Sequence, residues 1–568
     1  MLDALVVGAG PVGLTMGAEL TRHGARCRVI ETVQVPSRWS KAQAIHARTL
    51  EVLDNEGVAE ELVAWGEPVH GVSCYAPPDP ERLYRISLEG IPSPFPYVLS
   101  LSQRETEKTL EAQLKRIHGL GVERQVRLDA FTQDADGVTA MAVHADGTRE
   151  EIRAAYLLGC DGAHSTVREG LGFTLEGKTY PIRLLQADLR VDTDVPLPRD
   201  EIATFVSPGA FLVLFPMPGN SHFRVIIVEN TESSAMPLPV TLETFQDFVR
   251  EHGPRGAHVR DPEWMIDFRI HCRVVRRFRD GRVFLAGDAA HIHSPIGGQG
   301  MNLGIQDACN LAWKLALVRT GGARESLLDS YEIERRPLAE ATLKGTDRAT
   351  QGMLTALKMK RPWMIDALTS VLTPVVQLDA VQAKARRTLS MLGAAYRDSP
   401  AVGEDHTGRW KVRSPFASID ARPDLASWRR FREGPEPGTR VPDVVLDSLE
   451  GGAVRLFDIL RGTQHTLLLF AGVSPTEEVL QGLLHVAHVA SSRCGERLRI
   501  HLVLPRWTLP TDLPRGTSMI LDPEGPLHRA FGAYSSCLHV VRPDGYLGYR
   551  CQPADAERLG AWLDRIFT

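Results

Sequence analysis

The chain has 568 residues, of which 43% are hydrophobic and 24% charged, and its formal net charge is -5. This length predicts two to four domains, at a prior of about 150 residues each. Without a strong basic excess, neither nucleic acid nor an anionic membrane is expected as a partner. No apolar run approaches the roughly 18 residues that span a bilayer.

The eight cysteines include no C-x-x-C pair and no tight cluster. Their pattern predicts reduced thiols in a cytoplasmic protein, with neither a disulfide framework nor a metal site. The N-terminus carries Asp3, lacks a basic leader and is interrupted by glycines, so it is interpreted as the first strand of the fold and not as a signal sequence.

A short apolar strand over residues 5–7 leads into Gly8-x-Gly10-x-x-Gly13, and a helical pattern follows. This pattern provides a tight turn, close backbone approach for a pyrophosphate and close helix packing. A second strand over 27–30 ends at Glu31, where an acid can hold the hydroxyls of a ribose. The stretch therefore predicts dinucleotide binding, and the alternative is a coincidental glycine-rich turn.

The loop after this strand contains Arg38 and Lys41, which are either phosphate ligands or solvated side chains. Further on, Ser102 with Glu105 three residues later predicts a helix start. Gln103 then lies in the first turn, where a polar side chain can reach a cofactor.

Residues 122–158 alternate as antiparallel strands do, with turn signals at 136–137 and 146–147. They lead into YLLGCDGAHSTVR, residues 156–168, which again reads as an apolar strand that ends in an acid, Asp161, and a glycine before a helix.

The pattern of residues 173–273 predicts strands at 184–191, 203–206, 210–215 and 223–228. Their aromatic side chains predict one wall of an apolar substrate chamber. The alternative is that they form the core of the middle domain, and strand alternation requires this of about half of them. The candidate substrate contacts are Phe205, Phe211, Phe215 and Phe223.

The stretch RVFLAGDAAHIHSPIGGQGMNLGIQDACN covers residues 282–310. An apolar strand ends at Gly287-Asp288, and a glycine-rich turn after Pro295 precedes a helical pattern from Asn302. Such a helix directs free N-H groups and its positive end toward a ligand. His291-x-His293 has a spacing that suggests a metal, but no third ligand is near.

The segment 329–337, DSYEIERRP, predicts a charged helix start that locks onto the first domain, and residues 338–396 continue as helices. A linker rich in Pro, Gly and Arg is expected over 401–437. Residues 438–568 are expected to form a separate α/β unit, with strands at 466–470 and 498–504 and another from 538.

The set GAGPVG, CDGAHSTVR and GDAAH..P..GQGMN resembles the class A flavin-dependent aromatic hydroxylases, typified by para-hydroxybenzoate hydroxylase. The resemblance covers roughly residues 1–400. It implies that the glycine turn and Glu31 bind the ADP half of FAD, and that Gln103 and Asp288 reach its diphosphate and ribityl chain. It also implies that Asp161 belongs to a motif associated with both FAD and NAD(P)H, and that the turn near residue 300 flanks the isoalloxazine. The implied cofactor-binding set is Gly8, Gly10, Pro11, Val12, Gly13, Glu31, Lys41, Gln103, Asp161, Asp288, Pro295, Gly298, Gly300, Met301 and Asn302.

The resemblance implies an α/β fold in which a Rossmann-like FAD-binding domain (1–172 and, with a helical extension, 274–400) carries a β-sheet substrate domain (173–273). The last unit, 438–568, resembles the thioredoxin-like domain appended to larger hydroxylases of this kind. It lacks the redox C-x-x-C after Phe470, so a structural or dimer-stabilising role is expected and dithiol exchange is not.

The implied reaction uses NADPH or NADH to reduce FAD, after which O2 gives a C4a-hydroperoxide that hydroxylates a phenolic, polycyclic aromatic substrate. The flavin carries this chemistry, so no catalytic triad is needed. Baeyer-Villiger insertion beside a ketone and a non-catalytic flavin-fold binding protein remain alternatives, whereas the W-x-W-x-I-P stretch of a flavin halogenase is missing. A monomer or a homodimer is equally compatible with the sequence.

Overall fold

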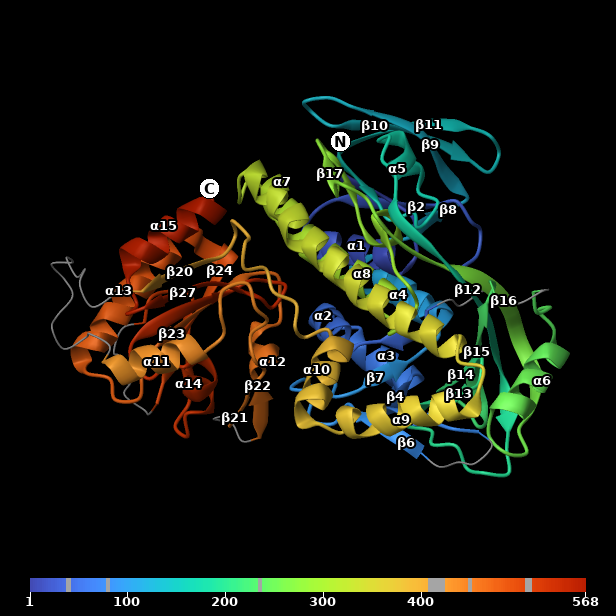
Figure 1. Cartoon of the computed structure of the whole chain (residues 1–568). Helices are drawn as coiled ribbons and strands as arrows, with labels where there is room; N and C mark the ends of the chain where they lie inside the picture. The colour runs from blue at the N-terminus through green and yellow to red at the C-terminus, as the bar shows by residue number, and fades with distance from the viewer. Residues whose placement is uncertain (37–41, 78–81, 233–236, 407–423, 448–451, 506–512) are drawn as a thin grey trace. The chain divides into compact units, whose positions relative to one another are not determined.

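The computed structural model describes residues 1–36, 42–77, 82–232, 237–406, 424–447, 452–505 and 513–568 (Figure 1). The chain divides into two compact units. Unit 1 comprises Met1–Thr21, Arg26–Cys309 and Arg336–Leu392, and unit 2 comprises Arg22–Ala25, Asn310–Arg335 and Gly393–Thr568.

The first sheet of unit 1 has the strand order β17-β18-β11-β1-β2-β8, and its five strands from β18 to β8 are parallel. Their apolar runs are buried on both faces, as expected for a parallel sheet covered by helices. The strands are β1 (Leu2–Val7), β2 (Cys27–Glu31), β8 (Val122–Arg124), β11 (Arg149–Gly159), β17 (Arg279–Asp280) and β18 (Val283–Leu285). The predicted strand-turn-strand pattern of 122–158 is confirmed by β9 (Val126–Gln133), β10 (Val138–His144) and β11.

The helices predicted after the glycine turn, after Ser102 and after Pro295 begin at or close to their expected starts. Helix α1 (Pro11–Arg22) follows the glycine turn, and α4 (Gln103–His118) is capped by Ser102, whose side chain accepts from the Glu105 N-H. Helix α7 (Gly300–Arg319) begins two residues before the predicted start and contributes residues to both units. The short helix α5 (Thr166–Gly170) follows β11.

The second sheet of unit 1 has the order β19-β16-β12-β15-β14-β13-β5-β6. All four strands predicted within 173–273 are present. The sheet has four further strands. Strand β16 belongs mainly to the same segment, whereas β5, β6 and β19 come from residues assigned to the first domain, and β5 pairs in parallel with β13. The strands are β5 (Gly71–Tyr75), β6 (Arg82–Ser87), β12 (Glu176–Asp192), β13 (Glu201–Ser207), β14 (Ala210–Pro216), β15 (His222–Asn230), β16 (His258–Val274) and β19 (His291–Ile292).

Helices cover the second sheet. Phe245 and Val249 of α6 (Leu242–His252) pack in one core with strand residues such as Leu212. The predicted helical stretch 338–396 is confirmed by α8 (Asp329–Leu357), α9 (Pro362–Val376) and α10 (Asp379–Ser390). Smaller elements of unit 1 are α2 (Ala47–Glu56), α3 (Ala59–Trp65), and the sheet of β3 (Ala44–Ile45), β7 (Val98–Ser100) and β4 (Glu67–Val69).

Within the described residues, no single helix is long and apolar enough to cross a membrane; α9 and α10, bent by 87° at their junction, satisfy the length and composition criteria only as a pair.

Unit 2 is built on a mixed six-stranded sheet with the order β20-β27-β26-β23-β24-β25. Its strands are β20 (Gly403–His406), β23 (His465–Phe470), β24 (Leu498–Leu504), β25 (Thr517–Leu521), β26 (Cys537–Val541) and β27 (Leu547–Gln552). The predicted linker 401–437 is therefore corrected, because it supplies β20 to this sheet and also helix α11 (Leu425–Glu433). Residues 407–423 lie outside the described residues.

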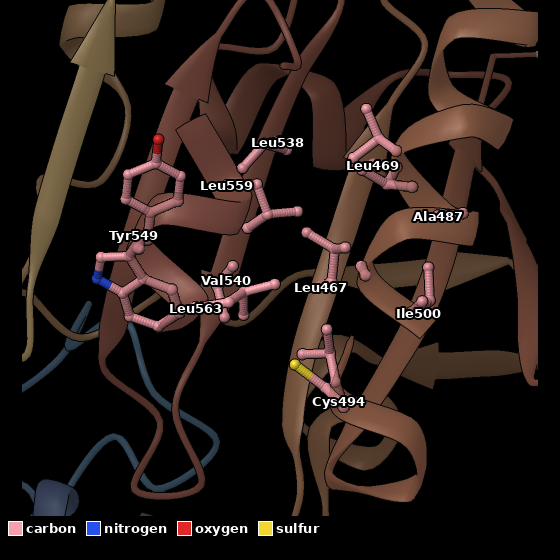
Figure 2. Close-up of a cluster of buried hydrophobic side chains, with 14 of the residues drawn as sticks. Leu467, Leu469, Ala487, Cys494, Ile500, Leu538, Val540, Tyr549, Leu559 and Leu563 are labelled. Atoms are coloured by element: carbon pink, nitrogen blue, oxygen red, sulfur yellow. The ribbon is translucent and has the colours of Figure 1, made fainter. Parts of the chain in front are cut away.

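Each face of this sheet has its own core. On one face, Leu467 and Leu469 of β23 cluster with Leu559 and Leu563 of α15 (Ala556–Ile566) and with Ala487 of α13 (Glu477–Cys494), as Figure 2 shows. The other core contains residues of α11, α12 (Leu456–Leu460) and α14 (Pro526–Phe531). A hairpin of β21 (Val445–Asp447) and β22 (Ala453–Arg455) also belongs to this unit.

Unit 2 also buries a cluster of charges around Glu334. Its carboxylate accepts from both terminal nitrogens of Arg542, at 2.7 and 2.9 Å, and from Lys314 Nζ at 2.7 Å. Asn310 and Ser399 donate to the same carboxylate, at 2.6 Å each. The segment 329–337 was predicted to lock onto the first domain. Its Glu334 binds Lys314 and Asn310 of α7, which lie within residues 274–400 assigned to that domain, and it also binds Arg542, which follows strand β26.

Candidate functional site

The carboxyl ends of the parallel strands β1, β2, β11 and β18 meet at one edge of the first sheet, as parallel pairing requires. The turn after β1 is closed by two glycines. A Cβ on Gly8 (φ +101°) would lie 2.5 Å from the Cys160 carbonyl oxygen, and one on Gly13 would lie 1.9 Å from the Gly8 oxygen. A Cβ on Gly10 would meet no atom within 4 Å. The open space at Gly10 fits a ligand that approaches the backbone closely, such as a dinucleotide diphosphate.

Pro11, Val12 and Gly13 form the first turn of α1, whose free N-H groups belong to this edge. Glu31 lies beside the turn, because its Oε2 accepts a hydrogen bond from the Ala9 N-H at 2.7 Å and its Oε1 one from the Val33 N-H at 3.1 Å. The acid is therefore held at the end of β2, where a ribose beside the diphosphate would lie.

Gln103 is engaged with the protein on both sides of its amide. Its Oε1 accepts from the Ala42 N-H at 3.2 Å, and its Nε2 donates to Glu107 Oε1 at 2.8 Å. Burial raises the pKa of Glu107 to about 7. The hydrogen bond from Gln103 lowers this pKa, whereas the nearby charge of Glu31 raises it further. Gln103 thus anchors the residue that follows Lys41, which itself lies outside the described residues together with Arg38.

Asp161 is placed at the end of β11 as predicted, but its carboxylate caps the next helix. It accepts from the Ser165 hydroxyl and, at 3.1 Å, from the Val167 N-H. Burial raises the pKa of Asp161, and these two bonds oppose the rise. These contacts explain why an acid stands at position 161 before the turn at Gly162. The role of Asp161 toward a cofactor therefore stays a prediction.

Asp288 follows β18 in the 3-10 turn η1 (Gly287–Ala289), and it is exposed at the same sheet edge. The surrounding backbone is tightly packed. A Cβ on Gly304 of α7 would lie 2.6 Å from Val12 Cγ2 and 3.0 Å from the Gly287 Cα. Helix α7, turn η1 and the start of α1 therefore approach closely only because glycines stand at these positions.

Asn302 fixes the turn that begins at Pro295. Its Nδ2 donates to the carbonyls of Ala44 and Gly298, both at 2.8 Å, and its Oδ1 accepts from the His46 N-H at 2.8 Å. Gly298 (φ +64°) closes the turn by donating its N-H to Pro295 O at 2.9 Å. Gly300 and Met301 then open α7, whose first-turn N-H groups and positive end belong to this loop.

His46, the residue before helix α2, contacts this loop and was not predicted from the sequence. Its Nε2 lies 2.9 Å from the Gly297 carbonyl oxygen, and burial lowers the pKa of the imidazole to about 4. The ring is therefore neutral at pH 7 and donates through Nε2. The only signal in the sequence was a polar residue within an otherwise apolar stretch before α2.

His291 and His293 are bonded to the protein. His291 Nε2 lies 2.7 Å from Asp307 Oδ2, and its Nδ1 lies 3.0 Å from His293 Nε2. Both nitrogens of His291 are thereby used. No group of three or more potential metal-binding side chains is found among the described residues.

The four predicted phenylalanines do not form one wall, and this expectation is corrected. Phe205 and Phe223 lie in the core between the second sheet and α6. Phe215 packs on the other face, with Ala44 and Ala47, and the half-buried Phe211 belongs to clusters with α8 and α9 residues. Strand alternation explains the division. Phe205 of β13 pairs with Leu212 of β14, so the two side chains lie on one face of the sheet, and Phe211 and Phe215 of β14 lie on the opposite face.

The face that carries Phe215 also carries a buried ion pair that was not predicted. Arg224, cross-strand neighbour of Phe215, binds Asp188 through Nε at 2.7 Å and through its other nitrogen at 2.8 Å, and Trp264 Nε1 donates to Asp188 at 2.9 Å. Arg224 also donates to the Ala42 carbonyl at 3.1 Å. The sequence signal that could have revealed this pair was the charge of Arg224 at an inward position of an otherwise apolar strand.

Comparisons with known proteins bear on this site. A family model described as an FAD binding domain matches residues 1–346. The pentachlorophenol 4-monooxygenase of Sphingobium chlorophenolicum is 32% identical over 559 residues, which cover 96% of this chain and 93% of the relative. The 6-methylpretetramide 4-monooxygenase of Streptomyces rimosus is 34% identical, covering 99% of this chain and 93% of the relative.

Solved structures are similar over nearly the whole length. An anhydrotetracycline hydroxylase from Streptomyces rimosus is 29% identical with a TM-score of 0.71, covering 100% of this chain and 99% of its own. An aklavinone-11 hydroxylase, solved with FAD and aklavinone, is 26% identical with a TM-score of 0.74, covering 99% and 98%.

Proposed function

The chain belongs to the family that carries this FAD-binding domain, and from that premise we propose that it is an FAD-dependent monooxygenase that uses NAD(P)H and O2 to hydroxylate a phenolic, polycyclic aromatic substrate. The observation that carries the proposal is the glycine-lined sheet edge, where Gly10 leaves open space beside Glu31 and the first turn of α1. The full-length relatives are named as monooxygenases of pentachlorophenol and 6-methylpretetramide, which supports this class of substrate.

The residues of the edge fit FAD. The backbone of Gly8 to Gly13 would hold the diphosphate, Glu31 the adenosine ribose, and Asp288 the ribityl chain, while Pro295, Gly298, Gly300, Met301 and Asn302 would flank the ring. Bound FAD supplies hydride acceptance from NAD(P)H and oxygen activation. Secondary candidates for cofactor contacts are Gln103, Asp161 and Lys41. Gln103 and Asp161 would act by fixing the loops to which they are hydrogen-bonded.

The protein's own contribution is a rigid loop beside the ring. Asn302 and His46 tie the backbone of Gly297 and Gly298 to strand β3 through four hydrogen bonds. A loop fixed in this way positions the start of α7, whose positive end would stabilise negative charge on a reduced ring. Phe215 and Phe211, on the face that also carries Arg224, are the candidates for apolar substrate contact.

The sheet of unit 2 supports a thioredoxin-like assignment for residues 438–568, extended by β20. Strand β23 lies between the parallel β24 and the antiparallel β26, with helices on both faces. Cys494, Cys537 and Cys551 are buried and unpaired, and none belongs to a C-x-x-C pair. A structural or dimer-stabilising role therefore fits this domain better than dithiol exchange.

Two substitutions test the site. Asp288→Ala is expected to abolish tight flavin retention, so a variant that purifies fully loaded with FAD would contradict the assignment. Gly10→Ala is expected to fold normally, because its Cβ meets no protein atom, and yet to bind FAD at least tenfold more weakly. The matched control is Gly345→Ala on α8, whose Cβ also meets no atom and which should leave FAD affinity unchanged. Equal FAD affinity of the Gly10 and Gly345 variants would argue against a diphosphate at Gly10.

A further inference from the structure

Helix α9 of unit 1 presents a row of apolar side chains to solvent. Trp363 is 63% exposed, Val371 64% and Val375 43%, and Leu378, just beyond the helix, is 57% exposed. At 100° per residue the three helical members fall within about a third of the circumference of the helix. Ile365 points the other way, and it is buried against Cys74 and Val206 of the second sheet. The helix is therefore anchored by one face and leaves an unusual amount of apolar surface on the other.

Basic side chains stand beside this row. Lys360 and Arg361 are exposed directly before Trp363, and neither forms an ion pair with another described side chain. Residues 358–387 contain six lysines and arginines against two acids, Asp366 and Asp379, a net charge of +4 in a chain whose total is -5. Positive charge is thus concentrated on the helices that carry the exposed apolar row.

We propose that this surface, formed by Lys360, Arg361, Trp363, Val371, Val375 and Leu378, docks the protein on an anionic lipid membrane. An indole ring is suited to the headgroup region, the aliphatic side chains bury apolar area at the acyl boundary, and the basic groups bind lipid phosphates. The helix would lie in the plane of the interface, held by Ile365 on its protein side.

Charge favours this occupant over a second copy of the chain. A two-fold contact centred on this surface would place two net-positive segments against each other, whereas an anionic leaflet supplies the opposite sign. The expectation of no membrane partner rested on the total charge of the chain, which averages this segment with more acidic ones.

The test measures sedimentation of the flavin-loaded protein with vesicles and does not depend on turnover. Vesicles of phosphatidylcholine containing phosphatidylglycerol are expected to retain the protein, with weaker retention as salt rises, whereas phosphatidylcholine alone is expected to retain little. Failure to bind phosphatidylglycerol vesicles, or equal binding to both kinds, would overturn the proposal and would leave the proposed reaction untouched.

Variants locate the surface. Lys360→Gln with Arg361→Gln should lower the partition coefficient about 25-fold, at about fivefold for each charge. Lys115→Gln with Arg116→Gln, exposed on α4, is the matched charge control and should change it by less than about twofold.

Trp363→Ser should weaken vesicle binding, whereas Trp65→Ser, a 60% exposed tryptophan on α3, should not. Flavin content and circular dichroism verify that each variant is folded. If the α9 variants instead turn a dimer into a monomer in light scattering, without affecting vesicle binding, the occupant is a second copy and the proposal fails.

Discussion

Two buried glutamates, one in each unit, have different surroundings. Glu107 in unit 1 accepts a hydrogen bond from Gln103 and has both Arg124 and acidic groups nearby, and burial raises its pKa to about 7. Burial would also raise the pKa of Glu334 in unit 2, but Arg542 and Lys314 hold it well below its ordinary value. Two basic side chains compensate Glu334, whereas at Glu107 burial outweighs the favourable contributions of Gln103 and Arg124. Glu107 also lies close to the residues that would contact a ligand.

The contrast between the two glutamates agrees with different roles for their surroundings, one structural and one for binding a ligand. A structural cluster is most stable when every charge has partners, as for Glu334 and Asp544 with Arg542 and Lys314. A binding edge has to keep donors and space for its ligand, and unit 1 does so with glycines and free N-H groups at the start of α1.

The largest expected effect follows from breaking the compensated cluster. Glu334→Gln leaves Arg542 and Lys314 buried with one acid in place of two, and it should destabilise the protein by about 3–5 kcal/mol. Glu340→Gln is the matched control, because Glu340 forms a partly exposed ion pair with Arg336 at 3.0 Å and should cost no more than about 0.5 kcal/mol. Denaturant unfolding of both variants measures this, and equal losses would contradict the account of the cluster.

Removing the carboxyl group of Glu107 should change stability in the opposite direction. The folded-state pKa of Glu107 lies above that of the unfolded chain, so its contribution to stability is lost as pH rises from about 4.5 to about 7. Glu107→Gln should therefore stabilise the protein by on the order of 2–3 kcal/mol at pH 8 and by under about 1 kcal/mol at pH 5. Thermal unfolding at the two pH values tests this; a gain independent of pH would show that the carboxyl is not the cause.

A smaller effect separates the two possible roles of Asp161. Asp161→Ala removes the acceptor for Ser165 and Val167 and should cost about 1–2 kcal/mol in flavin-free protein, and Asp161→Asn should cost less because it keeps one oxygen. Unfolding of the flavin-free variants and their FAD affinity are measured together. Unchanged stability with weakened FAD binding would make Asp161 a cofactor ligand first.

The elements of the fold that local pattern specifies were predictable from the sequence. The apolar run before Gly8, the acid that ends β2 and the cap at Ser102 each determine a boundary by local chemistry. The recruitment of β5 and β6 to the second sheet was not predictable, because pairing between β5 and β13 joins residues about 130 positions apart and leaves no local signal. The partner of Glu334 was missed for the same reason, since Arg542 is distant in sequence.

The parts of the candidate site in which glycines and acids follow strands were predictable from the sequence. The parts in which side chains form hydrogen bonds with the backbone of a distant segment were not. The role of Asn302 came from the resemblance, but its bonds to Ala44 and the contact of His46 with Gly297 depend on how β3 meets the loop. The four phenylalanines were treated as one set because spacing alone does not give the register that divides Phe205 from Phe215 between two faces.

The most direct test of the central claim is the visible absorption spectrum of the purified protein, followed in the same cuvette by NADPH or NADH addition with and without a series of polycyclic phenols. The account predicts a flavin spectrum and NAD(P)H oxidation accelerated by one class of phenol, with a product whose mass and NMR spectrum show a new ring hydroxyl and no inserted ester oxygen. A colourless protein that takes up no added FAD would contradict it.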